Sequence, residues 1–470
     1  MLHKLFKNTI IYAIGPQIPR IVSIFLLPLL TKHLTSYDYG IWALISVYNG
    51  LFSGLKILGM SQPMVNAFFK NKNHWKLHWR IMMGFLQAWS LLFNLLLSLF
   101  LWHMLPHDIE IYKKIIVVLS IGLSGVLFDT TITFGFRYFQ LSEKPIYIMF
   151  ITITTGFINI FLNIYTIVFL KLGFMGWAIS SFVNGLVTFT FLFYPLYIKE
   201  RIIPIFNYRW LILKHHLRIG LPTIPDNYSS YLLNASDRIV MDYYKIPTAQ
   251  IGLYSFAYNF GSLAEMGGEA MGMALSPIHT KILLAKNELK AKRLIFTLQY
   301  FFIILFFIIA LWIKEIFSVL VSNKELSNTY LMASLILFSY CYRPLYWGTV
   351  NLLGISGKTS QLWKISFAAG IVNLALNMIL IPIYGYKIAI ITTFLGLMYY
   401  AIAGYFLKAY KSISNENYHP LKWISAIIII FISLFWLVDM HWEFKLLITS
   451  SLLFILIKKI IEGTKILNIE

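Results

Sequence analysis

Apolar segments of about 20 residues recur along this chain from near its first residue to near its last. A helix of that length crosses the hydrocarbon core of a membrane and satisfies its own backbone hydrogen bonds there. Only 12% of the residues are charged and 59% are hydrophobic, whereas a soluble domain has about 25% charged residues. The sequence therefore predicts an all-α, polytopic membrane protein.

We expect about 14 transmembrane helices. The predicted spans are 8–31, 39–60, 81–105, 115–137, 146–170, 174–197, 215–236, 251–275, 295–320, 328–355, 363–384, 388–407, 423–440 and 444–461. The first span contains Pro16, Pro19 and Arg20 and lacks a small-residue cleavage site, so we do not expect it to be a cleaved signal.

The net charge of the chain is +20, and its positive residues are unevenly divided between the two sides of the predicted membrane. With the N-terminus inside, most Lys and Arg residues fall in cytoplasmic segments such as 199–218 and 281–293, which follows the positive-inside rule. We therefore expect both termini to lie in the cytoplasm. Basic loops of this kind contact anionic lipid head groups, so membrane lipids are expected partners and nucleic acid is not.

Motifs for an enzyme are missing. There is no P-loop, HExxH or GxSxG sequence, and the single cysteine, Cys341, excludes an internal disulfide and argues against a cysteine metal site. No connection is long enough for a folded extramembrane domain, and the outer loops are short. The prediction is a transporter that is not an enzyme and that has no metal or organic cofactor.

The chain repeats itself after about 212 residues. PQIPR (16–20) returns as PTIPD (222–226), YGIWALISVYNGL (39–51) resembles IGLYSFAYNFGSL (251–263), QLSEKP (140–145) aligns with GISGKT (354–359), and GFINIFLN (156–163) with GIVNLALN (370–377). Six spans, an even number, separate the copies, so the two repeats are parallel. We expect two pseudo-symmetric six-helix bundles with a cleft that opens alternately to either side.

The predicted organisation follows from the repeat. Residues 1–197 form an N-terminal lobe, 198–214 a basic cytoplasmic linker, 215–408 a C-terminal lobe, and 409–470 two further helices and a cytoplasmic tail.

The segment GLPTIPDNYSSYLLNASDRIVMDYYKIPTAQIGLYSFAYNF (220–260) resembles polysaccharide repeat-unit flippases of the Wzx type, in the multidrug/oligosaccharidyl-lipid/polysaccharide exporter superfamily. The positions that carry the resemblance are Gly220, Pro222, Ser236, Asp237, Arg238, Gly252 and Tyr254. The asparagine-containing helices around Asn159 and Asn163, and around Asn373 and Asn377, are also similar.

The resemblance implies a MATE-like fold and a flippase for undecaprenyl-diphosphate-linked oligosaccharide. Such a protein would move the head group from the cytoplasmic to the periplasmic leaflet for O-antigen or capsule biosynthesis, beside the polymerase and chain-length proteins of the pathway. The alternatives are a cation-coupled multidrug or small-molecule extruder of the same fold and a membrane glycosyltransferase, polymerase or ligase. The last class would need a long outer loop, which is missing.

Ionisable groups inside the membrane are the candidate site, because each is costly to bury. Arg20 and Arg343 could bind the diphosphate, since guanidinium matches phosphate oxygens. The repeat places Asp226 at the position of Arg20, and Arg343 opposite Asp129. One reading is two salt bridges, one in each lobe, with Asp129 as the partner of Arg20; the other gives Asp226 a coupling H+ or Na+.

A third group combines Lys56, a candidate cleft cation, with Glu265 and Glu269. The two carboxylates lie four residues apart on one helix face and could hold one coupling proton between them. The equally weighted alternative pairs them with Lys56 and Arg80 near the inner surface.

Asp237 and Arg238 are predicted to form a gating or interfacial pair at the outer end of the seventh span. Prolines at corresponding positions of the two halves are expected to bend the first and seventh spans beside the cleft. They are Pro16, Pro19, Pro222 and Pro225.

Overall fold

The computed structural model describes residues 17–70, 74–207, 209–358, 361–414 and 416–468. The structure is 86% helical, and its described residues contain no strand. The described part of each predicted span falls on one helix or on two or three consecutive ones, which confirms the all-α class. The chain divides into two compact units, residues 1–228 and 229–470, here called the first and the second unit.

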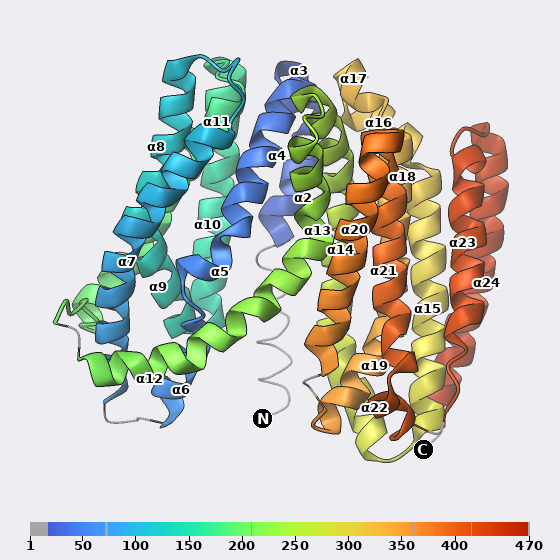
Figure 1. The fold of residues 1–470 in the computed structure, drawn as a ribbon. Helices are drawn as coiled ribbons and strands as arrows, with labels where there is room; N and C mark the ends of the chain where they lie inside the picture. Colours follow the sequence, from blue (N-terminus) through green and yellow to red (C-terminus); the bar gives the residue numbers. More distant parts are fainter. Residues whose placement is uncertain (1–16, 71–73, 208, 359–360, 415, 469–470) are drawn as a thin grey trace. The chain divides into compact units, whose positions relative to one another are not determined.

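The first unit contains the predicted spans one to six and the start of the seventh (Figure 1). Its helices are α2 (Gln17–Phe25), α3 (Leu27–His33), α4 (Ser36–Leu51), α5 (Ser53–Lys56), α6 (Ser61–Lys70), α7 (Trp75–Met104), α8 (Ile111–Leu127), α9 (Asp129–Leu141), α10 (Pro145–Asn163), η1 (Ile164–Phe169), α11 (Phe174–Phe193), η2 (Tyr194–Lys199), α12 (Trp210–Gly220) and η3 (Leu221–Thr223). Helix α13 (Ile224–Tyr243) starts in the first unit and continues into the second.

The second unit holds the remaining spans. Its helices after α13 are α14 (Thr248–Leu284), α15 (Glu288–Leu311), α16 (Ile313–Leu320), α17 (Lys324–Ser327), α18 (Tyr330–Ser339), η4 (Tyr340–Tyr342), α19 (Arg343–Ile355), α20 (Leu362–Tyr384), η6 (Tyr386–Ile388), α21 (Ala389–Phe406), α22 (Lys408–Lys411), α23 (Pro420–Leu437) and α24 (Trp442–Asn468).

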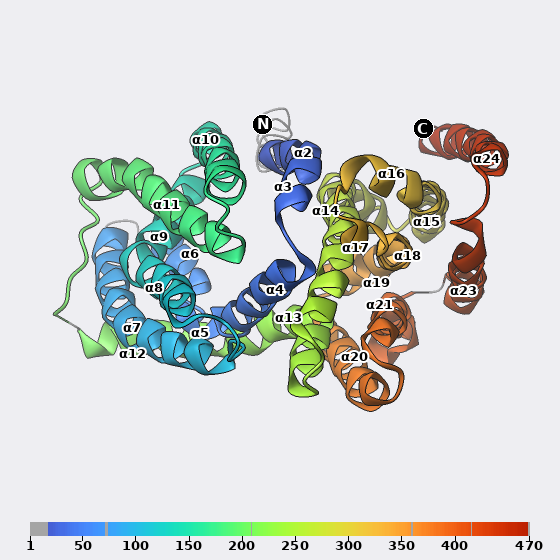
Figure 2. The same ribbon diagram turned by 90° about the horizontal axis from the view of Figure 1, so that it is seen from above.

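Long apolar helices packed side by side build the first unit. Figure 2 shows α7, α8 and α11 next to one another, and α8 packs against both of the others. The core at one end of this bundle contains the fully buried Trp79, Met82, Phe134 and Leu192. The Trp79 indole donates a hydrogen bond of 3.0 Å to the Met64 carbonyl, which fixes α6 to α7.

Many of the spans are interrupted. Among the described residues, seven helices are long and apolar enough to cross a membrane unbroken, and α8 with α9 would make an eighth that is bent by 47°. The other predicted spans are split, as in α2–α3 and α18–η4–α19, or carry many polar groups, as in α13. A break exposes backbone groups, which a membrane protein tolerates where they are buried in protein or line a cavity.

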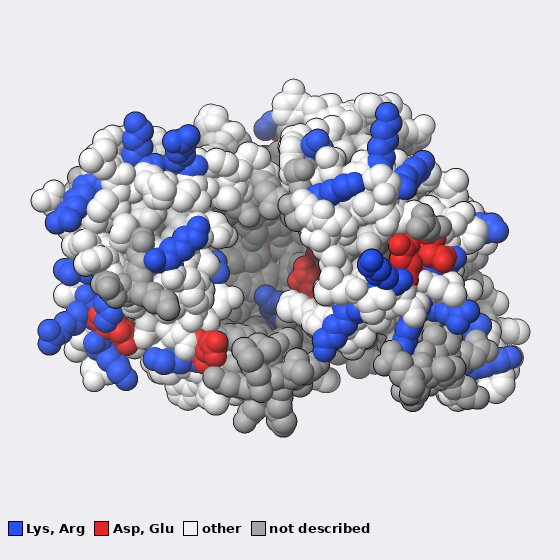
Figure 3. All heavy atoms as spheres, turned by 90° about the horizontal axis from the view of Figure 1, so that it is seen from below, with Lys and Arg blue, Asp and Glu red and all other residues white. Residues whose placement is uncertain are grey.

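The basic segment after η2 closes one end of the first unit. Ile205 and Arg80 are joined by a backbone hydrogen bond of 2.9 Å, and the Arg80 guanidinium donates to the Ile203 carbonyl. The amphipathic helix α12 then packs on α6 and α7, with Leu213 and His216 buried and its Lys and Arg residues exposed. Figure 3 shows that Lys and Arg outnumber Asp and Glu on this face of each unit.

Glu200 is the acidic residue around which this end is organised. Its carboxylate accepts hydrogen bonds from the Tyr138 hydroxyl (2.5 Å) and the Lys76 amine (3.0 Å). Burial alone would raise the pKa of Glu200, but these two donors and the neighbouring lysine charges outweigh it, so the pKa lies below its usual value.

Candidate functional site

Lys56 and Asp129 form an ion pair in the first unit. Lys56 is the last residue of α5, and Asp129 is the first residue of α9, directly after the 47° bend at Phe128. A carboxylate is favourable at a helix N-terminus, where the backbone N–H groups carry partial positive charge. The side chains are 23% and 31% exposed, so the pair is only partly buried.

This pair corrects one interpretation of the sequence. Asp129 pairs with Lys56 and leaves Arg20 without it, although the repeat alignment offered Asp129 as the partner of Arg20. Within the first unit, Lys56 is held by Asp129, and the Arg80 guanidinium donates a hydrogen bond to the Ile203 carbonyl. The alternative that pairs these cations with the glutamates of α14 stays a prediction. The bend between α8 and α9, which the sequence does not reveal, brings Asp129 to α5.

Arg20 lies on α2, which packs against α10, and its side chain is exposed. Within the described part of the chain, no carboxylate forms an ion pair with it; its carbonyl accepts a hydrogen bond of 2.6 Å from Ser23. Arg20 is thus a cation with no carboxylate partner among the described residues, which makes it a candidate for binding an anion.

The prolines differ in their local roles. Pro19 is the third residue of α2, which continues past it to Phe25; the break in this span comes at Leu26, before Pro28. Pro19 instead fits against Gly156 of α10, where an added Cβ would stand 2.4 Å from the proline ring. Pro16 lies outside the described residues.

The second proline pair lies at the start of α13. Pro222 belongs to the short 3-10 turn η3 between α12 and α13, so the seventh span does change its helical form there. Pro225 and Asp226 follow in the first turn of α13. The side chain of Asp226 is outside the described part of the structure, so its predicted role stays a prediction.

Arg343 and Glu265 form the corresponding pair in the second unit. The guanidinium donates a hydrogen bond of 2.7 Å to Glu265 and stands 3.9 Å from Glu269. Arg343 is 11% exposed, Glu265 22% and Glu269 54%. The two glutamates, one turn apart on α14, thus share one arginine, and Arg343 begins α19 just as Asp129 begins α9.

The approach of these helices depends on a glycine. A Cβ on Gly268 would lie 3.2 Å from Cγ of Arg343, tighter than an ordinary contact, whereas a Cβ on Gly267 would meet nothing within 4 Å. Nε of Arg343 is buried and has no hydrogen-bond partner among the described residues. The arginine therefore retains a donor beyond those used by its carboxylates.

A polar network extends from this pair through the second unit. Asn234 donates to Glu265 at 3.5 Å, and the Tyr258 hydroxyl contacts both Asn234 (3.3 Å) and Tyr340 (2.9 Å). The guanidinium of Arg238 lies over the Tyr258 ring, 4.0 Å from its centroid. Cation–π contact of this kind stabilises an arginine removed from water.

Asp237 and Arg238 are at the far end of the network. They approach to 3.3 Å and both are buried, and Tyr254 donates a hydrogen bond to Asp237. The Arg238 guanidinium also donates a hydrogen bond of 2.9 Å to the Asn234 carbonyl. The structure thus encloses the pair in protein; its predicted gating role stays a prediction.

The network includes residues that the sequence did not identify as site residues, namely Asn234, Tyr258 and Tyr340. The sequence alone does not show how deeply a neutral hydroxyl or amide group in an apolar helix is buried, or which neighbour its side chain faces. Tyr258 lies one turn after Tyr254 and one turn before Ser262 on α14. This spacing indicates a polar stripe on one face of the helix, and it is the signal in the sequence that points to Tyr258.

The asparagines of α10 in the first unit and of α20 in the second unit differ in their hydrogen bonding. In the second unit, the Asn373 side chain donates a hydrogen bond of 3.0 Å to the Leu233 carbonyl of α13. The Asn377 side chain accepts a hydrogen bond from the Thr392 hydroxyl of α21. In the first unit, the amide oxygen of Asn163 is buried with no partner among the described residues. The expected bonding between helices is present only for the second copy in the described structure.

No group of three or more His, Cys, Asp or Glu residues that could hold a metal ion occurs among the described residues. The charges of the second unit described above form ion pairs and hydrogen-bonded chains. Such an arrangement can bind and release an anion or a proton.

The fold is that of known transporters. The chain matches an inward-facing multidrug resistance MATE family transporter of the MOP superfamily with a TM-score of 0.59 at 15% identity, covering 89% of this chain and 98% of the other. A MOP superfamily transporter from Pyrococcus furiosus, described as having a binding pocket of reverse polarity, matches with a TM-score of 0.57 at 15% identity, covering 90% and 96%.

A variant of a Vibrio cholerae MATE transporter matches with a TM-score of 0.56 at 15% identity, covering 88% of this chain and 98% of that one. No curated protein sequence matches this chain significantly. The family model for polysaccharide biosynthesis proteins matches residues 5–283, more than half of the chain, and agrees with the Wzx-type resemblance of the sequence. The chain therefore belongs to the polysaccharide biosynthesis protein family and has the fold of the MATE transporters.

Proposed function

We propose that the protein is a flippase for undecaprenyl-diphosphate-linked oligosaccharide repeat units. It translocates the sugar-diphosphate head group from the cytoplasmic to the periplasmic or outer leaflet by alternating access of its two lobes, for O-antigen or capsule biosynthesis. Membership of the polysaccharide biosynthesis family is the observation that carries this proposal, and the transporter fold supports it.

The cations at membrane depth support an anionic substrate. Arg20 is unpaired among the described residues, and Lys56 and Arg343 are each held by carboxylates. A diphosphate offers more negative charge than one carboxylate and accepts paired hydrogen bonds from guanidinium. Arg20 would thus bind the diphosphate, and a phosphate that reaches Lys56 or Arg343 would displace the carboxylate held there.

Coupling to H+ or Na+ is part of the proposal. Glu265 and Glu269 share Arg343, so a head group that takes the arginine leaves two neighbouring carboxylates, which favour binding one cation between them. Asp226, Asp237 and Arg238 would serve coupling or gating. The proposed location is the bacterial inner membrane with both termini cytoplasmic, beside the polymerase and chain-length proteins of the pathway.

A cell that lacks the gene tests this function. We expect lipid-linked repeat units to accumulate with their sugars facing the cytoplasm, and surface polysaccharide to disappear until the gene is restored. The glycosyltransferase reactions should continue in such a strain, because the protein acts after them. Normal surface polysaccharide, or a failure to form the lipid-linked unit at all, would refute the proposal.

The competing function is a cation-coupled multidrug extruder of the same fold. One neighbouring structure is described as a multidrug resistance transporter, and the exposed Glu269 could attract a cationic drug. Drug sensitivity of the same deletion strain distinguishes the two: the extruder predicts sensitivity with intact polysaccharide, and the flippase predicts the reverse.

A further inference from the structure

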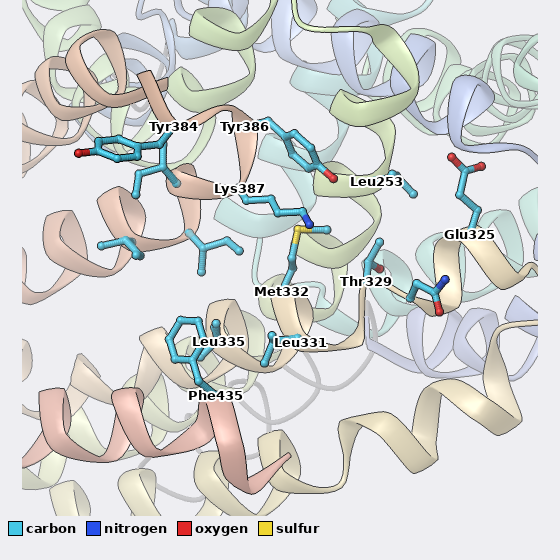
Figure 4. A pocket seen from close by; sticks show the side chains of 14 residues that line it. Leu253, Glu325, Thr329, Leu331, Met332, Leu335, Tyr384, Tyr386, Lys387 and Phe435 are labelled. Atoms are coloured by element: carbon cyan, nitrogen blue, oxygen red, sulfur yellow. The ribbon is translucent and has the colours of Figure 1, made fainter. Parts of the chain in front are cut away.

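A cavity of about 510 Å³ lies in the second unit, away from the charged pairs described above. Its walls come from the starts of α14 and α18, the turn η6 between α20 and α21, and the end of α23 (Figure 4). This is the end of the second unit at which α23 and α24 are connected (Figure 1). Its volume is within the range of small-ligand sites, about 300–1,000 Å³.

The interior of the cavity is apolar. Met332 and Leu335 of α18, Ile390 and Ile391 of α21, and Phe435 of α23 line it. Met332 and Leu335 are buried, whereas Ile391 and Phe435 are also exposed on the surface. The cavity therefore opens along the outside of a helix bundle that spans a membrane, where the surrounding molecules are lipids.

One cation reaches into this apolar space. Figure 4 shows the side chain of Lys387 extending from η6 toward Met332, with Tyr386 beside it. Among the described residues, no group forms a hydrogen bond or an ion pair with the Lys387 amine. Glu325 lies elsewhere on the same rim, so the rim carries one charge of each sign.

The mouth of the cavity is at the level of a membrane interface. Tyr384, which lines it, is exposed, and Trp436 and Trp442 are exposed near the adjoining ends of α23 and α24. Tyrosine and tryptophan at helix ends are typical of the boundary between hydrocarbon and head groups. An amine at this depth can bind a lipid phosphate while the apolar walls take an acyl chain.

We propose that this cavity binds one zwitterionic phospholipid, phosphatidylethanolamine, of the adjacent leaflet. Lys387 binds the phosphate, Glu325 balances the charge of the rim and faces the ammonium group, and an acyl chain lies along Leu335, Ile391 and Phe435. On the topology proposed above this is the outer leaflet. The inference does not depend on which molecule the protein transports.

Native mass spectrometry of the purified full chain tests this inference, with titration of phosphatidylethanolamine, phosphatidylglycerol and undecaprenyl phosphate. We expect one tightly retained phosphatidylethanolamine. Lys387→Gln should weaken its binding about tenfold, since a hydrogen bond between charged groups is lost. Ile391→Trp, which fills the cavity from its exposed side, should abolish the retained lipid.

Lys324→Gln is the matched control, because Lys324 lies on the adjacent α17 but does not line the cavity. It should bind lipid as the unaltered protein does. Thermal unfolding of each variant shows whether it is folded. Unchanged retention in a folded Lys387→Gln or Ile391→Trp variant, or preferential binding of phosphatidylglycerol or undecaprenyl phosphate, would overturn the inference.

Discussion

The two units each place an ion pair where an interrupted span begins its second helix, but with the charges exchanged. In the first unit the cation of α5, Lys56, meets the acid that starts α9; in the second unit the acid of α14, Glu265, meets the arginine that starts α19. The sequence repeat aligns Asp129 with Arg343. The residue that begins the second helix thus lies at equivalent positions of the repeat in the two units and carries opposite charge.

The surroundings of the two pairs also differ. Lys56 and Asp129 are 23% and 31% exposed, whereas Arg343 is 11% exposed and its partner Glu265 is tied through Asn234 and Tyr258 to Arg238. The first pair can open with little change in its neighbours. The second is fixed in a network, so substrate binding there must be linked to a change elsewhere in the unit.

Arg343→Gln should have the largest effect. It leaves Glu265 without its partner in a mostly buried site, and breaking a buried pair costs about 3–5 kcal/mol of unfolding free energy. We expect transport to be lost as well. The double variant Glu265→Lys with Arg343→Asp, which gives the second unit the polarity of the first, should recover thermal stability but not transport. Recovery of both would show that the pair is only structural.

Arg20→Ala should abolish polysaccharide export with little effect on folding, since the side chain is exposed and unpaired among the described residues. Membrane insertion and thermal unfolding should match those of the unaltered protein. Lys32→Ala, an exposed cation at the end of α3, is the control and should export normally. Normal surface polysaccharide in the Arg20→Ala strain would remove Arg20 from the site.

Lys56→Gln should be milder than Arg343→Gln. Partly exposed pairs contribute about 1 kcal/mol or less, so the free energy of unfolding should change little. Transport should fall by about tenfold, the loss expected for one hydrogen bond to a charged group. A loss of stability equal to that of Arg343→Gln would contradict the contrast between the two units.

Glu269→Gln and Asp226→Asn test where the coupling ion binds. Glu269 is half exposed and stands 3.9 Å from Arg343, so its neutralisation should leave the protein folded. Flipping in vesicles should then lose its dependence on a pH gradient, with Glu443→Gln, an exposed carboxylate on α24, as the control. Gradient dependence that survives both substitutions would make these carboxylates structural.

The smallest effect is expected at the connection between α23 and α24. The Lys314 amine donates a hydrogen bond of 2.5 Å to the Asp439 carboxylate. This hydrogen bond is the largest cause of the lowered pKa of Asp439. The contact should therefore stabilise the protein at pH above the unfolded pKa of this aspartate and be lost as the pH falls through its lowered folded value. The difference in melting temperature from Asp439→Asn should shrink over that acidic range; a constant difference would contradict the assignment.

The fold could be predicted because it depends on features that one chain displays directly. Apolar length and charge bias gave the spans, and the repeat from PQIPR to PTIPD gave two equivalent halves. The contacts of the candidate site residues were harder to predict from the sequence. Ion pairing depends on how each helix is rotated about its axis, and a bend such as that at Phe128 redirects every residue after it. Lys56 and Asp129 were both identified as candidates, but not as partners.

The network of the second unit shows a second limit. Charged residues inside a membrane stand out because of their cost, and Glu265, Asp237 and Arg343 were found this way. Tyr258 and Tyr340 did not stand out, since a tyrosine in an apolar helix has the same appearance whether it faces lipid, a helix interface or an ion pair. The sequence thus located the charges but not the neutral groups that connect them.

The most direct test of the proposed function uses purified protein in phospholipid vesicles with a fluorescent undecaprenyl-diphosphate oligosaccharide in both leaflets. A glycosidase added outside removes the sugars that it can reach. Protein-free vesicles should protect about half of the substrate, because passage of a charged head group through hydrocarbon is costly. The account predicts that the unaltered protein exposes nearly all of it and that Arg343→Gln does not; protection equal to that of empty vesicles would contradict it.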